Sequence, residues 1–181
     1  MAQAGRGAQA GPELTAFQLE VARLFFGLPA SKGFLLAGGA APLAQHLTTR
    51  PTEDLDFFTA PERGHVPAVN APPDSPASPT AAGPTLAPEE LAGHKLLALF
   101  DRAAARDFAG VYVLARRFGK DVLLARASQI DAGFDPAVLA SMLTTLDRFT
   151  DDEIPLPDDS TAAELQLIRP GPGPPSRPAT C

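Results

Sequence analysis

Cysteine is almost absent from this chain, which has a single one at Cys181. One cysteine cannot form an intrachain disulfide framework or a zinc site built from cysteines. No apolar run approaches the roughly 18 residues that span a bilayer, and the first residues lack the apolar centre of a signal peptide. The sequence therefore predicts a cytoplasmic protein with no membrane partner.

Positive charge is also scarce, because 15 Lys and Arg stand against 21 Asp and Glu. The formal net charge is −6, and the pI is about 5.0. This balance argues against a protein that holds nucleic acid through an overall cationic field. A local basic face is still compatible with it.

Proline is abundant, at 20 of the 181 residues, while a hydrophobic content of 45% is enough for a core. This length and composition predict one compact domain with tails. The expected segments are a flexible N-terminus (1–11), a core (12–60), a proline-rich linker (61–88), a helical region (89–150) and a disordered tail (151–181).

The spacing of apolar residues predicts the elements on each side of the linker. An amphipathic helix from Pro12 to near Gly27 precedes a buried strand over 34–37 and a short helix over 40–47. About four helices are expected over 89–150. Eight prolines in 61–88 leave no strand to be expected there. The predicted fold class is α/β of the α+β kind, with a small mixed sheet followed by a helical bundle.

Two short motifs carry the chemistry. Gly38 and Gly39 follow the predicted strand, where a glycine pair lets backbone N–H groups approach a phosphate closely. Asp54 and Asp56 lie two residues apart on a second expected strand, so their side chains share one face. Paired carboxylates suit Mg²⁺ or Mn²⁺, and such an ion orients a triphosphate and its leaving pyrophosphate. Two solvated acids on an edge strand are the alternative interpretation.

The order of these motifs resembles the minimal nucleotidyltransferases of the DNA polymerase β superfamily. More closely, GGAAPLAQHL followed by RPTEDLDFF resembles the nucleotidyl transferase AbiEii/AbiGii toxin family of abortive-infection and toxin–antitoxin systems. The segment KLLALFDR followed by RDF is similar to that family's helical motif. Together the matched pieces cover roughly residues 33 to 60 and 88 to 150. The resemblance implies that 12–60 is a nucleotidyltransferase core.

The resemblance also implies a role for each matched residue. Gly38 and Gly39 would contact the triphosphate, and Asp54 and Asp56 would bind Mg²⁺ or Mn²⁺. Lys95, as a catalytic residue, and Arg102, as a nucleotide-binding residue, would face the NTP. The implied reaction moves a nucleoside monophosphate to a hydroxyl of RNA, such as a tRNA end, or of a protein, and a cognate antitoxin would restrain it.

The spacing of these residues agrees in part with the implied roles, because Lys95 and Arg102 are seven residues apart and can share one helix face. The helix is expected to end between Arg102 and Asp107, so Asp107 is not placed with these two cations. Spacing alone favours a simple surface ion pair for Arg102.

The chain departs from the family pattern at three points, one of which is Val111, where the family has an acidic residue four positions after its Arg-Asp step. Ala40 follows the glycine pair where the family usually has a phosphate-binding Ser or Thr. The linker 61–88 also replaces a strand that supplies a third carboxylate. These departures leave two alternatives open: a degenerate relative that only binds nucleotide or a protein partner, and a helical interaction protein whose acidic pair is accidental.

Overall fold

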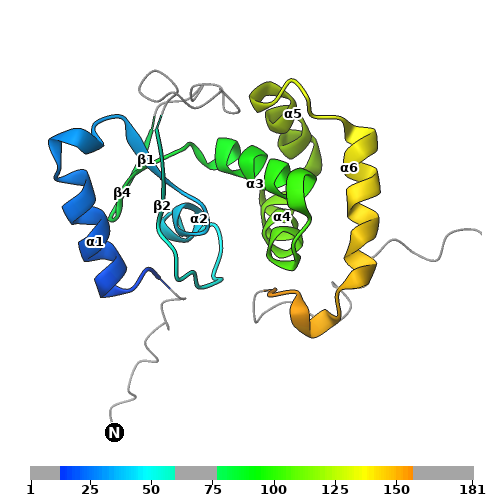
Figure 1. Ribbon diagram of the computed structural model, residues 1–181, viewed down its shortest axis with the longest axis horizontal. Coiled ribbons are helices and arrows are strands. Elements are labelled where there is room, and N and C mark those ends of the chain that lie inside the picture. The colour runs from blue at the N-terminus through cyan, green and yellow to red at the C-terminus, as the bar shows by residue number, and fades with distance from the viewer. Residues whose placement is uncertain (1–12, 60–76, 157–181) are drawn as a thin grey trace, which may run out of the picture.

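The computed structural model describes residues 13–59 and 77–156 (Figure 1). Its fold class is the predicted one, a mixed sheet with a helical bundle on its C-terminal side. The strands are β1 (Phe34–Ala37), β2 (Asp56–Thr59), β3 (Ser78–Thr80) and β4 (Gly83–Thr85). The α-helices are α1 (Ala16–Phe26), α2 (Ala40–Ala44), α3 (Pro88–Arg102), α4 (Ala105–Phe118), α5 (Lys120–Ile130) and α6 (Pro136–Leu143). Short 3-10 helices are η1 (Pro29–Ser31), η3 (Thr144–Arg148) and η4 (Asp151–Glu153).

The four strands form one sheet in the order β2-β1-β4-β3. Strand β1 pairs antiparallel with β2, and this register places Ala37 opposite Asp56. On its other side β1 runs parallel to β4, with Leu36 opposite Thr85. The register therefore brings the turn that follows β1 next to the first residue of β2.

The expectation that 61–88 holds no strand is wrong. Residues 60–76 of the predicted linker lie outside the described residues, but β3 and β4 fall within its last part. Proline is tolerated here because β3 is an edge strand, and Pro79 is paired only with Pro84 in a short hairpin. Thr85 is fully buried and accepts a hydrogen bond from Gln45, which ties β4 to the end of α2.

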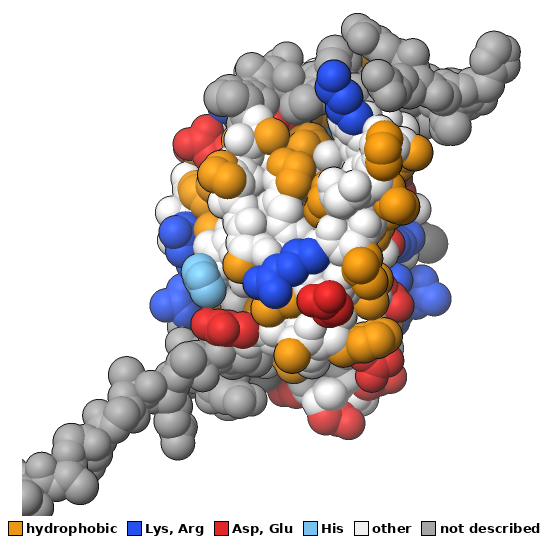
Figure 2. Space-filling view, turned by 90° about the vertical axis from the view of Figure 1, so that its left-hand side faces the viewer, with side chains coloured by type: hydrophobic (Ala, Val, Ile, Leu, Met, Phe, Trp, Pro, Cys, Tyr) orange, Lys and Arg blue, Asp and Glu red, His pale blue; other side chains and the backbone are white. Residues whose placement is uncertain are grey.

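Helix α1 packs on the sheet through aromatic side chains. Phe25 stacks on Phe57 of β2 with ring centroids 4.0 Å apart, and Phe26 meets the same ring edge-on at 5.5 Å. The opposite face of α1 is uncovered by the described chain, because Phe17 and Leu24 are both exposed. Figure 2 looks at this side of the molecule, where patches of hydrophobic side chains alternate with charged ones.

The helical bundle predicted for 89–150 is built around α3, which leaves the sheet directly after β4 (Figure 1). Its Gly93 allows α5 to approach closely, since a Cβ there would lie 2.7 Å from the Cβ of Arg126. The helix ends at Ala103, whose φ of 44° is left-handed, and α4 starts two residues later. Among the described residues, no helix has the length and apolar character to cross a bilayer.

Candidate functional site

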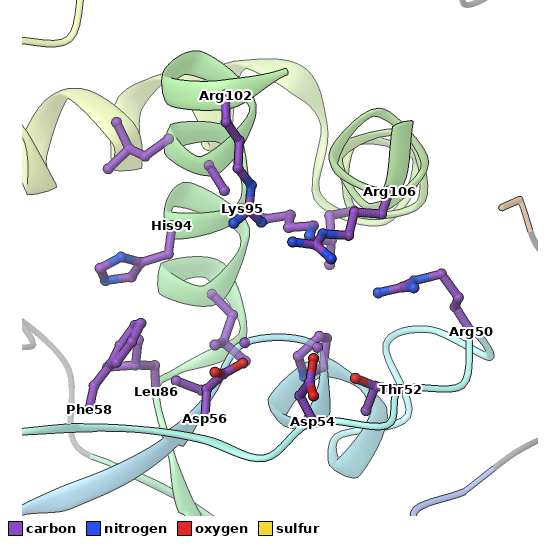
Figure 3. A pocket seen from close by; sticks show the side chains of 18 of the residues that line it. Arg50, Thr52, Asp54, Asp56, Phe58, Leu86, His94, Lys95, Arg102 and Arg106 are labelled. Carbon is purple, nitrogen blue, oxygen red and sulfur yellow. The ribbon is translucent and has the colours of Figure 1, made fainter. Parts of the chain in front are cut away.

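One cleft of about 800 Å³ separates the strand ends from α3 and the start of α4 (Figure 3). Its walls contain all six residues that the sequence singled out: Gly38, Gly39, Asp54, Asp56, Lys95 and Arg102. The first four come from the sheet side, and the last two come from α3. Residues that are far apart in the chain therefore share one solvent-filled space.

The glycine turn is in close contact with the second acidic residue. Gly38 has a φ of 58°, which favours glycine, and a Cβ at this position would overlap the carboxylate of Asp56. At Gly39 a Cβ would lie 2.9 Å from Oγ1 of Thr52. Both glycines are thus needed for two polar side chains to lie directly against the backbone.

The acidic pair lies on the exposed face of β2 and of the residues leading into it. Asp54 and Asp56 are exposed, whereas Leu55 and Phe57 between and after them pack against the core. This is the alternation that the sequence predicted. The strand itself begins at Asp56, so Asp54 lies on the loop just before it. In Figure 3 both side chains rise from the floor of the cleft toward α3.

The two cations of α3 are held by a residue that spacing did not place with them. Asp107 is fully buried, and its Oδ1 accepts a hydrogen bond from Nζ of Lys95 at 3.0 Å. Arg102 donates from Nε to Oδ2 at 2.7 Å and from Nη2 to Oδ1 at 2.9 Å. The helix ends between Arg102 and Asp107, as the sequence predicted, yet Asp107, which spacing left unplaced, contacts both Lys95 and Arg102.

Local backbone geometry explains this contact. The left-handed conformation of Ala103 ends α3 and changes the direction of the chain. Asp107 lies in the first turn of α4, which begins two residues later, so its side chain is close to the end of α3. One turn further along α4, Gly110 makes room for the lysine stem, because a Cβ there would overlap Cε of Lys95. Asp107 and Gly110 together set the position of the Lys95 side chain.

Burial and pairing act in opposite directions on the ionisable groups of this cluster. Burial by itself raises the pKa of Asp107, but the hydrogen bonds from Arg102 and the charge of Lys95 outweigh it and lower that pKa to about 2. Burial lowers the pKa of Lys95, and the Asp107 carboxylate offsets only part of this effect. The hydrogen bond to Asp107 raises the pKa of Arg102. Asp107 is therefore ionised at neutral pH.

The cleft is also lined by polar residues to which the sequence assigned no part in the site, among them Arg50, Thr52 and Arg106. Arg50 and Thr52 come from the loop between α2 and β2, and Arg106 comes from the first turn of α4. The first two lie within the RPTEDLDFF segment, two and four residues before Asp54, which was the one signal for them in the sequence. Figure 3 shows the guanidinium groups of Arg50 and Arg106 turned into the cleft.

The other end of the cleft is apolar and aromatic. Phe58 of β2 is 43% exposed, and its ring centroid lies 6.3 Å from that of His94 on α3. Leu86 and Leu91 complete this end. Burial lowers the pKa of His94, which keeps its ring uncharged at neutral pH. The cleft thus runs from an uncharged end to a cationic end, with the acidic pair between them.

The two exposed carboxylates of the cleft are candidate ligands for a magnesium ion. In 13–59 and 77–156 no cluster of three His, Cys, Asp or Glu side chains has the geometry to hold a metal ion. Mg²⁺ in phosphate-transfer sites is commonly held by one or two carboxylates, with substrate phosphates and water as the other ligands. Asp54 and Asp56 fit that pattern.

Comparison of the chain with family models, with curated proteins and with solved structures finds no match.

Proposed function

We propose that this protein is a Mg²⁺-dependent nucleotidyltransferase that moves a nucleoside monophosphate from an NTP to a hydroxyl of RNA or of a protein. One observation carries the proposal: an exposed pair of carboxylates faces Lys95 and Arg102 across a single cleft, beside a glycine turn. Phosphoryl chemistry of this kind depends on positioning and on charge stabilisation, and these groups supply both.

Asp54 and Asp56 would hold Mg²⁺ or Mn²⁺ together with the phosphates of the nucleotide. The bound ion neutralises phosphate charge and stabilises the departing pyrophosphate. Lys95 spends one of its three N–H donors on Asp107, so two are left for a phosphate oxygen. Asp107 thus keeps the ammonium in place while its remaining donors stay available to substrate.

The uncharged end of the cleft suits the nucleobase. Phe58 presents an exposed ring next to His94, and base stacking on an aromatic side chain is worth about 1 to 3 kcal/mol. Leu86 and Leu91 bring no hydrogen-bonding side chain to this end. A site of this composition binds bases by stacking more than by reading their edges.

Nucleotide binding without transfer is the second candidate, and a specific observation favours it. The strand β4 lies beside β1, and neither β4 nor β3 carries a carboxylate, since the two read Gly-Pro-Thr and Ser-Pro-Thr. Asp56 is the one carboxylate on the four described strands, and Asp54 lies on the loop just before it, so neither β3 nor β4 supplies a third acidic ligand to draw a proton from the attacking hydroxyl.

The proposal of a toxin held in check by an antitoxin rests on the resemblance alone, which is carried by the segments GGAAPLAQHL, RPTEDLDFF and KLLALFDR followed by RDF. Within that proposal the acceptor is a cellular RNA or protein whose modification stops growth. The two acceptor classes are distinguished by which of them takes up label in the experiment below.

The experiment measures transfer of label from each of four α-labelled NTPs to total RNA and to protein, with Mg²⁺ or Mn²⁺. The variant in which Asp54→Asn and Asp56→Asn are combined is expected to lose both transfer and metal-dependent NTP binding, because two metal ligands are gone. Asp101→Asn is the matched control, since it removes an acidic side chain that lines the same cleft from α3.

Transfer by the wild type and by the control, but not by the double variant, supports the enzyme. Metal-dependent binding without transfer supports the binding-only candidate. NTP binding that is equal in the wild type and in the double variant would overturn the metal site and the metal-dependent transferase that rests on it.

A further inference from the structure

We propose that Arg50, Thr52 and Arg106 form the subsite for the two terminal phosphates of the nucleotide, the part that leaves as pyrophosphate. This inference rests on the proposed function of the same cleft. It assigns the direction in which a triphosphate lies, with its end at the loop between α2 and β2.

Unpaired positive charge is the first observation. Within residues 13–59 and 77–156 neither Arg50 nor Arg106 forms an ion pair, whereas Arg102 and Lys95 are both held by Asp107. The two guanidinium groups come from opposite walls, and both turn into the cleft (Figure 3). Because neither guanidinium group is taken up by an ion pair with a described residue, both positive charges are available to the oxygens of a bound polyphosphate.

The position of Arg50 relative to Lys95 is the second observation. The positive charge of Arg50 contributes to lowering the pKa of Lys95, so the two groups are electrostatic neighbours. Both residues also line the same cleft, so a phosphate chain bound at Lys95 would extend toward Arg50. Arginine is well suited to this contact, because its planar fork donates two parallel hydrogen bonds to phosphate oxygens.

A hydroxyl placed by the backbone is the third observation. A Cβ at Gly39 would lie 2.9 Å from Oγ1 of Thr52 and 3.5 Å from Nη2 of Arg50, so these three residues are packed together. The carbonyl of Thr52 accepts a hydrogen bond from Nε2 of Gln18 at 2.7 Å, which fixes the loop to α1. Thr52 thereby brings a hydroxyl to the glycine turn, while Ala40 in the next position is fully buried and brings none.

The polarity of the cleft favours terminal phosphates over the sugar or the base. Phe58 and His94 form the uncharged end, and Asp54 and Asp56 lie between that end and the two arginines (Figure 3). A nucleotide stacked at the uncharged end places its α-phosphate near the acidic pair. Its β- and γ-phosphates then extend to Arg50, Thr52 and Arg106.

The test uses the full chain and measures Mg²⁺-dependent binding of an NTP, of the matching NMP and of pyrophosphate. Arg50→Ala and Arg106→Ala are each expected to weaken binding of NTP and pyrophosphate by about tenfold or more, the loss of one charge-assisted hydrogen bond. Binding of NMP should stay unchanged. Thr52→Val should weaken binding of NTP and of pyrophosphate, whereas Thr52→Ser, which keeps the hydroxyl, should bind both as the wild type does.

Arg23→Ala is the control, because it removes an exposed arginine on α1 that does not line the cleft. This variant should bind all three ligands as the wild type does. Arg50→Lys and Arg106→Lys keep the charge without the fork, and unfolding curves confirm that each variant is folded. Equal losses for NMP and NTP would overturn the terminal-phosphate assignment. Unchanged binding of all three ligands in these variants would also overturn it.

The proposed function can fail separately from this inference. A wild type that binds pyrophosphate through Arg50 and Arg106 but transfers no label retains the phosphate subsite without the enzyme. A wild type that binds neither NTP nor pyrophosphate contradicts both.

Discussion

Asp107 is the residue on which the positive wall of the cleft depends. It is fully buried, and it binds Lys95 and Arg102 at once. Removing one partner of a buried ion pair leaves the other charges uncompensated, a loss of about 3 kcal/mol or more. Asp107, which does not itself line the cleft, therefore fixes the positions of Lys95 and Arg102, which do.

The first prediction concerns the acid stability that Asp107 confers. Because its pKa falls from 3.8 to about 2 on folding, the ionised carboxylate stabilises the folded state above pH 4 by about 2 kcal/mol. That stabilisation is lost as the pH falls from about 4 toward 2. Urea unfolding of the wild type and of Asp107→Asn should differ most at pH 6 and progressively less down to pH 3. A difference that does not change with pH would contradict this account.

A second prediction separates position from stability at Gly110. In Gly110→Ala the new Cβ overlaps the end of the flexible Lys95 side chain, so the lysine must move while the helix gains from alanine. NTP affinity should drop with no decrease in the free energy of unfolding. Both are measured on one preparation, by calorimetric titration and by urea unfolding.

Gly93→Ala is the matched comparison for Gly110→Ala. Its Cβ would lie 3.1 Å from the backbone carbon of Arg126, which cannot move aside as a side chain can. This variant should lose stability because α3 and α5 are pushed apart. Loss of stability in Gly110→Ala as well would show that the Lys95 stem cannot yield.

At the scale of elements, α1 supports the cleft from outside it. Gln18 completes a capping box with Thr15, and its Nε2 donates to the carbonyl of Thr52. The start of a helix on the far side of the sheet thus fixes the loop that carries Arg50 and Thr52. This contact between α1 and the loop is a single side-chain hydrogen bond, so a substitution can remove it while the helix stays folded.

A third prediction follows for Gln18→Glu. The carboxylate still accepts from the N–H of Thr15, as Oε1 of Gln18 does now, but has no proton to donate to Thr52. We expect weaker NTP binding and a loss of stability of about 1 to 2 kcal/mol. Thr15→Ala removes the cap at a cost of about 1 kcal/mol and should leave NTP affinity unchanged. If Gln18→Glu bound NTP as tightly as Thr15→Ala does, the hydrogen bond from Gln18 would not be needed to position the loop.

Not every element could be predicted from the sequence, and β3 and β4 show why. Each is three residues long with a central proline, so local propensity argues against both. They exist because β4 pairs with β1 and β3 covers its outer edge, both of which are tertiary events. Long amphipathic helices such as α3 were predictable because their apolar period is a property of the local sequence.

At the scale of the whole molecule, local patterns indicated separate parts of the candidate site, but not how these parts meet across the cleft. The glycine turn and the acidic pair belong to neighbouring antiparallel strands, so pattern and spacing located them. The link from Asp107 to Lys95 depends on a left-handed Ala103, and no glycine marks that reversal in the sequence. The convergence of Arg50 and Arg106 depends on how the sheet and the bundle pack, which no local pattern records.

The parallel pairing of β1 with β4 has a consequence for synthesis on the ribosome. Domains begin to fold from the N-terminal side as the chain emerges, yet β1 must wait for Thr85 before its second neighbour exists. Asp54 and Asp56 emerge early, whereas Asp107 and Gly110, which place Lys95, emerge after α3 is complete. A nascent chain therefore exposes the acidic wall of the cleft before its cationic wall has been made, and the two walls of the candidate site face each other only after the first turns of α4 have been added.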